Sequence, residues 1–269
     1  MPVPAIRVAA RRYAAVLMLP VLLAASAGCD VMTADLKHTE TAEWRKTYDL
    51  ASSGRVEITN VNGRIVVEPS SNQTVEVVAV KKARGATQES AREALGRIEI
   101  RDESSGQGVK VATHFTRSGG WFQGGGEVTY TVKMPAGADA RFTTVNGGLE
   151  ITGLSGRVVA ETTNGGVVAR DISGPIEATT TNGGVNLDLS RVAEGGAKLG
   201  CTNGGLKLRL PADARATISA SVTNGGIDVH GLELESTQST RRRLEARLNG
   251  GGPQVTIEGT NGGIDISRR

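Results

Sequence analysis

A short motif constrains the fold of this chain more than any other feature of its sequence. Asn-Gly, with an apolar residue three places after the asparagine, occurs at Asn62-Gly63, Asn146-Gly147, Asn164-Gly165, Asn182-Gly183, Asn203-Gly204, Asn224-Gly225 and Asn261-Gly262. In the regular part the copies are spaced 18 residues apart twice and then 21 residues apart twice. Repeats of about this length are typical of architectures in which each repeat is one structural unit.

Between these turns, apolar and polar residues alternate. After Asn164, for example, the apolar positions are Val167, Ala169, Ile172, Ile176 and Ala178. A period of two places one set of side chains inside and the other in solvent, which predicts β-strands. Asn-Gly tolerates the positive φ of a tight turn, so the chain bends sharply at each copy.

Two architectures fit this pattern: a β-solenoid with one coil per repeat, or a meander of nine-residue hairpins that forms a sandwich or barrel. The turn and core positions recur in every copy, as stacked coils require, and this favours the solenoid. We therefore expect an all-β, single-domain β-solenoid (β-helix-like) of about seven coils of 18–21 residues. The segment Gln88–Leu95 is rich in helix formers and predicts one short helix inserted in the N-terminal half.

The first 28 residues have the order of a secretory signal peptide. Three arginines and no acid precede an apolar run from Tyr13 to Ala25, which is shorter than the roughly 20 residues of a membrane span. Small residues lead to Cys29, and this arrangement resembles the lipobox of bacterial lipoproteins. The resemblance implies a lipid on Cys29, and the predicted organisation is a signal peptide (1–28), a tether (29–46) and a solenoid domain (47–269).

Removal of the signal peptide leaves a formally neutral chain of 28 basic and 28 acidic residues. The basic isoelectric point of the precursor is therefore no indication of nucleic-acid binding. Cys201 is the only other cysteine, so with Cys29 lipidated the fold has no internal disulfide.

The repeated Thr-x-Asn-Gly turns, the Pro-Ala-x-Ala segments before two of the strands and the lipoprotein signal together resemble the bacterial putative-adhesin family, domain of unknown function 4097. The resemblance covers roughly Arg55 to Ile266. It implies an envelope-facing β-solenoid, and the family has no catalytic residues that could be assigned to positions of this sequence.

Trp121 and Phe122 are the candidate partner contacts, because two large aromatic residues stand at a glycine-rich tip and such residues often anchor interfaces. The alternative is that this tip covers the end of the solenoid. The recurring asparagines are interpreted as a structural turn ladder, comprising Asn146, Asn164, Asn182, Asn203, Asn224 and Asn261.

The residue before the asparagine is threonine at 163, 181, 202, 223 and 260. We interpret this column as a surface ladder of strand formers, with carbohydrate or ordered water as the alternative ligand of its hydroxyls. Calcium is disfavoured because the turns lack a complete set of carboxylates, and His38, His114 and His230 form no metal-type pair. No metal, no cofactor and no catalytic residues are predicted.

The sequence thus predicts a non-enzymatic envelope lipoprotein that presents a β-solenoid for binding or scaffolding, facing the periplasm or the cell exterior. Its expected partners are a membrane, through lipid on Cys29, and an envelope protein or polysaccharide. Two alternatives stay open: a self-assembling structural protein, and a glycan-acting β-helix enzyme whose carboxylates folding would bring together.

Overall fold

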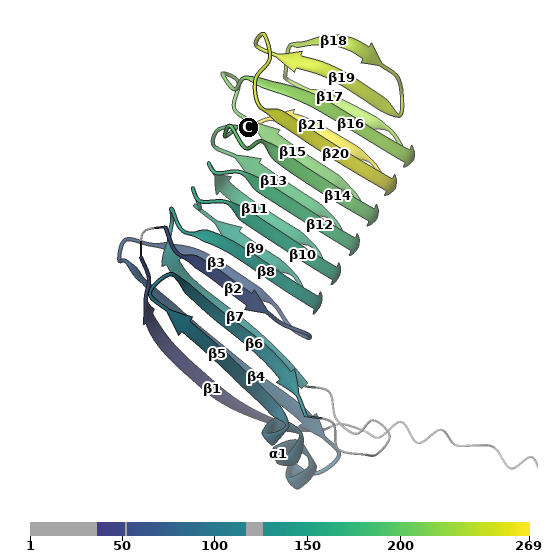
Figure 1. Ribbon diagram of the computed structural model, residues 1–269. Helices are drawn as coiled ribbons and strands as arrows, with labels where there is room; N and C mark the ends of the chain where they lie inside the picture. Colours follow the sequence, from purple (N-terminus) through teal and green to yellow (C-terminus); the bar gives the residue numbers. More distant parts are fainter. Residues whose placement is uncertain (1–36, 52, 117–125) are drawn as a thin grey trace, which may run out of the picture. The chain divides into compact units, whose positions relative to one another are not determined.

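The computed structural model describes residues 37–51, 53–116 and 126–269. These residues belong to one compact unit, Asp35–Arg269. The described part contains 21 strands and one α-helix, and the strands form two sheets (Figure 1). No helix in these ranges is long and apolar enough to cross a membrane.

The first sheet, sheet A, has ten strands. In spatial order they are β1 (His38–Asp49), β4 (Thr74–Gly85), β7 (Gly126–Pro135), β3 (Ile65–Ser70), β9 (Leu149–Thr152), β11 (Val167–Ile172), β13 (Val185–Leu189), β15 (Leu206–Leu210), β21 (Ile264–Arg268) and β17 (Ile227–His230).

The second sheet, sheet B, has eleven strands. Their spatial order is β18 (Leu234–Ser239), β19 (Arg243–Leu248), β16 (Ala216–Asn224), β20 (Gln254–Asn261), β14 (Ala197–Asn203), β12 (Ile176–Asn182), β10 (Val158–Asn164), β8 (Asp139–Asn146), β2 (Arg55–Thr59), β6 (Gly108–Phe115) and β5 (Ile98–Ser105).

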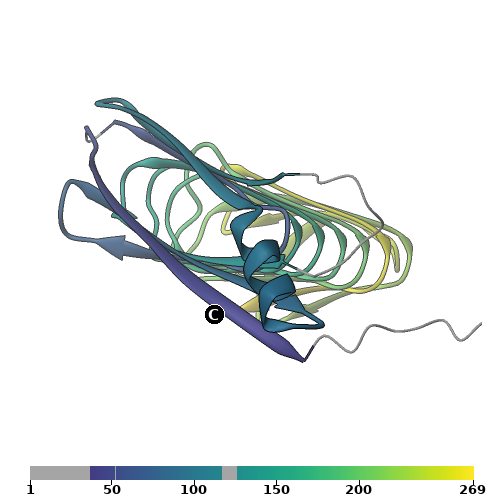
Figure 2. The same ribbon diagram turned by 90° about the horizontal axis from the view of Figure 1, so that it is seen from below.

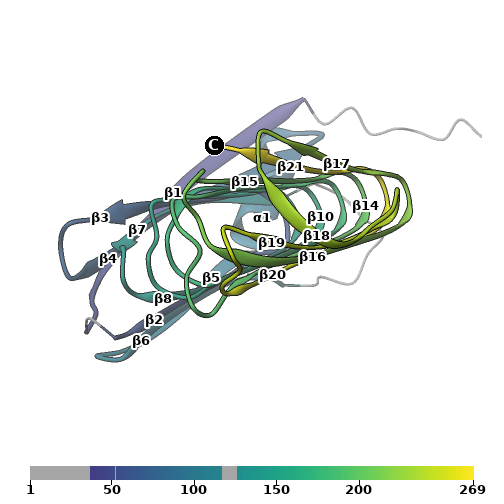
Figure 3. The same ribbon diagram turned by 90° about the horizontal axis from the view of Figure 1, so that it is seen from above.

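Each coil consists of a strand of sheet B, an Asn-Gly turn and a strand of sheet A. Strand β10, for example, leads through Asn164-Gly165 into β11, and both pair in parallel with the strands of the next coil. Figure 3 looks along the stack and shows the two sheets as the two long sides of the coils. Hairpins would have produced antiparallel pairs, so the parallel register confirms the predicted β-solenoid.

Alternation along the strands fills a narrow core between the sheets. In β10, Val158, Ala160 and Thr162 are buried, whereas the residues between them face solvent. The core consists mainly of Val, Ile, Leu and Ala, and Tyr130 and Phe142 are its largest fully buried side chains. Tyr130 is hydrogen-bonded across the core to Thr113 at 2.7 Å, and burial raises its pKa to about 12.

The spatial order of the coils differs from their order in the sequence at both ends. The last coil, β20–β21, lies between β14–β15 and β16–β17. The first coil, β2–β3, lies between β6–β7 and β8–β9. Antiparallel strands explain the arrangement at the C-terminal end: β19 occupies one edge of β16, so the last coil pairs in parallel with the other edge.

Antiparallel strands also cover the first end of the stack. In sheet A, β4 pairs with β7 and β1 with β4, and in sheet B, β5 pairs with β6. Helix α1 (Gln88–Gly96) packs on β4 and β1 at this end, with Ala91 and Ala94 buried (Figure 2). The helix was predicted at this position, and Thr87 caps it by accepting a hydrogen bond from the Ser90 N–H at 3.1 Å.

The tether predicted for residues 29–46 includes most of a strand. Strand β1 begins at His38 and pairs with β4 along its whole length. Charged residues such as Glu40, Glu43 and Arg45 interrupt the apolar pattern by which a strand is recognised in the sequence. Edge strands often carry such charges, which discourage pairing with another chain. The compact part of the chain therefore starts about ten residues earlier than the sequence pattern indicates.

Candidate functional site

The asparagines of the turns form a ladder of side-chain hydrogen bonds along one side of the stack. In each of six steps, the Nδ2 of one asparagine donates to the Oδ1 of its neighbour at 2.8–2.9 Å. In spatial order the ladder runs through Asn62, Asn146, Asn164, Asn182, Asn203, Asn261 and Asn224. The amides bond to one another, so this column holds the coils in register and is a poor candidate for a ligand site.

A second column, two residues before each asparagine, binds the carbonyl groups of the turns. Thr162 and Thr180 donate their hydroxyls to Gly147 and Gly165 at 2.9 and 2.8 Å. Cys201 occupies the same column and donates its S–H to the Gly183 carbonyl at 3.0 Å. Burial raises the pKa of the Cys201 thiol, so it stays protonated at neutral pH and is a structural group.

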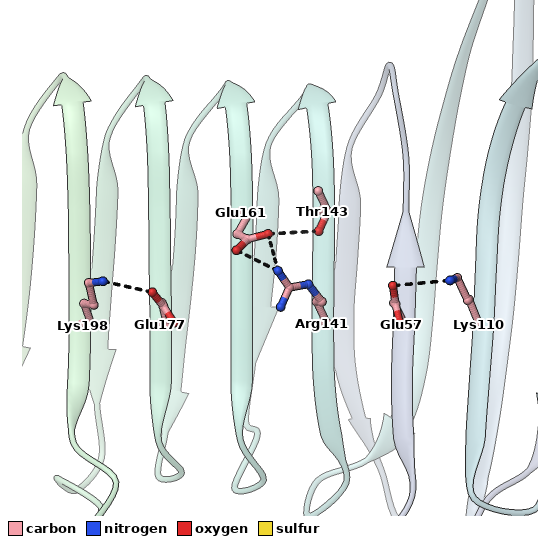
Figure 4. Close-up of polar contacts among 7 residues, drawn as sticks. All are labelled: Glu57, Lys110, Arg141, Thr143, Glu161, Glu177 and Lys198. Carbon is pink, nitrogen blue, oxygen red and sulfur yellow. Dashed lines mark hydrogen bonds and ion pairs between the residues drawn. The ribbon is translucent and has the colours of Figure 1, made fainter.

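The outer face of sheet B carries ion pairs between neighbouring strands (Figure 4). Lys110 lies 3.9 Å from Glu57, and Lys198 lies 3.3 Å from Glu177. The Arg141 guanidinium contacts both carboxylate oxygens of Glu161 at 2.9 and 3.0 Å. Such exposed pairs contribute about 0–1 kcal/mol each. They neutralise the charges of this part of the face.

Further along the same face, the surface is hollowed at Gly200. Strand register places Gly200 between Thr179 of β12 and Glu258 of β20. Side chains two residues further along lie on the same face. The resulting groove has a volume of about 360 Å³, and we call it the Gly200 groove. Its outward-facing residues are Thr179, Thr181, Gly200, Thr202, Glu258 and Thr260.

One glycine accounts for the depth of the groove. Gly200 stands at an outward position where both flanking strands carry a side chain. The outer surface of β14 is therefore bare at this position. Gly259 of β20 belongs to the inner column beside Cys201, where an added Cβ would meet Val222 and Leu206 of the core.

The outward-facing polar side chains of the Gly200 groove have no partners among the described residues. The hydroxyls of Thr179, Thr181, Thr202 and Thr260 make no side-chain hydrogen bond there, and the Glu258 carboxylate makes no ion pair. Two other hollows on this face, of about 400 and 240 Å³, differ because they contain the Glu57–Lys110 and Glu177–Lys198 pairs. The Gly200 groove is therefore the best candidate site of the described chain.

The residues predicted to form lipid and partner contacts cannot be placed in this structure. Cys29, Trp121 and Phe122 lie outside the described residues. His38, His114 and His230 lie on β1, β6 and β17. Within residues 37–51, 53–116 and 126–269, no three His, Cys, Asp or Glu side chains gather in a way that could hold a metal ion.

Sequence reasoning found the threonine column but missed Gly200 and Glu258. A signal was present, because Gly200 is an outward glycine in a strand whose counterparts carry Thr143, Glu161 and Thr179. Glu258 could not be connected with it, since β20 follows β14 by about fifty residues and lies next to it only because the last coil is inserted into the stack.

The family model described as Toastrack DUF4097 matches residues 50–267. No curated protein matches the chain. Solved structures that match the chain include a putative cell adhesion protein from Clostridium sporogenes, with a TM-score of 0.44, 11% identity, and coverage of 86% of this chain and 100% of that one. A putative adhesin from Bacteroides fragilis has a TM-score of 0.37 and 8% identity, covering 85% and 97%. A putative lipid binding protein from Parabacteroides distasonis has a TM-score of 0.30 and 12% identity, covering 87% and 97%.

Proposed function

The chain belongs to the Toastrack DUF4097 family, and from this premise we propose that it is a non-enzymatic lipoprotein of the bacterial cell envelope. In this proposal, lipid on Cys29 holds the protein at a membrane and the solenoid presents the outer face of sheet B to a ligand. The observation that carries the binding role is the Gly200 groove, whose outward-facing polar side chains make no side-chain hydrogen bond or ion pair within the described residues.

The arrangement of the groove favours binding over catalysis. Glycoside hydrolysis usually needs two carboxylates that flank the scissile bond. Among the residues that line the groove, Glu258 is the one carboxylate. A single carboxylate among several hydroxyls suits a binding site for a polar ligand better than it suits acid–base chemistry.

The ends of the stack favour a single presenting unit over a filament. A filament of stacked coils would need parallel strand edges at both ends. At the first end, sheet A finishes in the antiparallel strand β1 and sheet B in the antiparallel strand β5, so that end offers no parallel edge. At the other end, sheet B finishes in the antiparallel strand β18, whereas sheet A finishes in β17, which is parallel to β21. We expect the purified protein to have the mass of a monomer that dilution does not change, whereas concentration-dependent oligomers would support the structural alternative.

Replacing the predicted lipid-bearing cysteine tests the anchoring. We expect the wild-type protein in the membrane fraction of cells and the Cys29→Ala variant in the soluble fraction, because the variant has no thiol for the lipid. The matched control is Cys201→Ala, which removes the buried thiol and should leave the distribution unchanged. Equal membrane association of Cys29→Ala and wild type would contradict the proposed anchor.

A further inference from the structure

We propose that the Gly200 groove is a binding subsite for a neutral oligosaccharide. The inference rests on the proposed binding function and names the ligand class for one place on the solenoid. The groove has a volume of about 360 Å³. This lies within the range of roughly 300–1,000 Å³ of pockets that hold small organic ligands. Strands β12, β14 and β20 supply its walls and lie in one continuous parallel sheet.

The shape of the groove follows from the strand register. The row Thr179, Gly200 and Glu258 has its middle side chain missing. The next row of the same face is Thr181, Thr202 and Thr260, which precede three consecutive asparagines of the ladder. A ligand in the groove would thus lie over Gly200, with hydroxyls along one side and a carboxylate and a hydroxyl at its two ends.

The chemistry of the walls matches that of a sugar. Each threonine hydroxyl both donates and accepts hydrogen bonds, and a carboxylate accepts from two hydroxyls at once. Sugars present the same mixture of donors and acceptors at high density. The hydroxyls of Thr179, Thr181, Thr202 and Thr260 are not engaged with other side chains, so a ligand does not have to displace an internal bond.

The same residues disfavour other ligands. No lysine or arginine lines the groove, and Glu258 would repel an anion. An apolar ligand would leave the hydroxyls without partners. A calcium ion requires six to eight oxygen ligands, including several carboxylates as a rule, whereas this groove has one carboxylate.

The test is binding of triacetylchitotriose to the purified full-length lipoprotein in detergent micelles, followed by saturation-transfer NMR on the sugar signals. We expect saturable binding to the wild type, and loss of the signal in Gly200→Thr, which fills the groove. A Cβ at Gly200 would approach the Thr179 methyl group at 3.2 Å, and threonine is a good strand residue, so this variant should keep its fold. Thr202→Val, which removes one hydroxyl, should weaken binding about fivefold.

Thr163→Val is the matched control, because Thr163 belongs to the same column but does not line the groove. It should bind as the wild type does, and thermal unfolding should show that all variants are folded. No binding of triacetylchitotriose, or binding that Gly200→Thr leaves unchanged, would overturn the assignment. In either case the membrane fractionation of Cys29→Ala is unaffected, so failure of the subsite is distinguishable from failure of the envelope anchoring.

Discussion

Replacing Gly204 with alanine is expected to lower the free energy of unfolding by about 3 kcal/mol or more. Gly204 follows an asparagine of the ladder and has a φ of +148°, a conformation that a residue with a side chain rarely adopts. A Cβ there would also collide with the carbonyl oxygen of Gly183 in the neighbouring coil. The Gly183 carbonyl belongs to the backbone of the neighbouring strand, so it cannot move away from the Cβ without disturbing the parallel ladder. Urea unfolding followed by circular dichroism measures the effect.

The adjacent glycine supplies the control for this prediction. A Cβ at Gly205 would have the Gly263 carbonyl oxygen as its nearest neighbour, at 3.8 Å, which is ordinary contact. Gly205→Ala should therefore change stability by less than about 1 kcal/mol. Equal stabilities of the two alanine variants would show that the coils do not approach one another as closely as described.

The second large effect is expected for Phe142→Ala, which should destabilise the protein by about 3–5 kcal/mol. Phe142 is fully buried in β8, between Ile58 of β2 and Ala160 of β10. Truncation removes most of the side chain, and the surrounding strands are held by the ladders on both sides, so they cannot close the cavity. Thermal or urea unfolding of the purified variant gives the difference.

Val145 on the same strand is the control for Phe142. Its side chain is 41% exposed, so Val145→Ala should change stability by about 0.5 kcal/mol or less. A loss from Phe142→Ala as small as this would contradict the placement of Phe142 in the core between the two sheets.

Much of this fold could be predicted from the sequence because each coil repeats the same alternation of buried and exposed residues and the same Asn-Gly turn. The alternation identified the strands, and inward positions such as Val167 and Leu206 are buried as their columns require. The parallel architecture followed from the recurrence of the turn. The Gln88–Leu95 segment was also identified, because helix formers interrupt the period of two.

The order of the coils could not be predicted from the same pattern. Asn203, Asn224 and Asn261 have equivalent neighbours in sequence, so any of their coils fits beside any other. The choice depends on the pairing of β16 with β19, which leaves a single edge of β16 for the last coil. The Gly200 groove depends on this choice, since Glu258 reaches β14 only through the inserted coil.

The most direct test of this account is disulfide trapping between coils in a Cys29→Ala, Cys201→Thr background. Neighbouring strands lie about 4.8 Å apart and next-nearest strands about 10 Å apart. A disulfide needs Cα atoms within about 7 Å. Because Asn203 contacts Asn261, and Asn261 contacts Asn224, Thr202→Cys should cross-link readily with Thr260→Cys and not with Thr223→Cys. Cross-linking of positions 202 and 223, without cross-linking of 202 and 260, would contradict the inserted coil and the groove built on it.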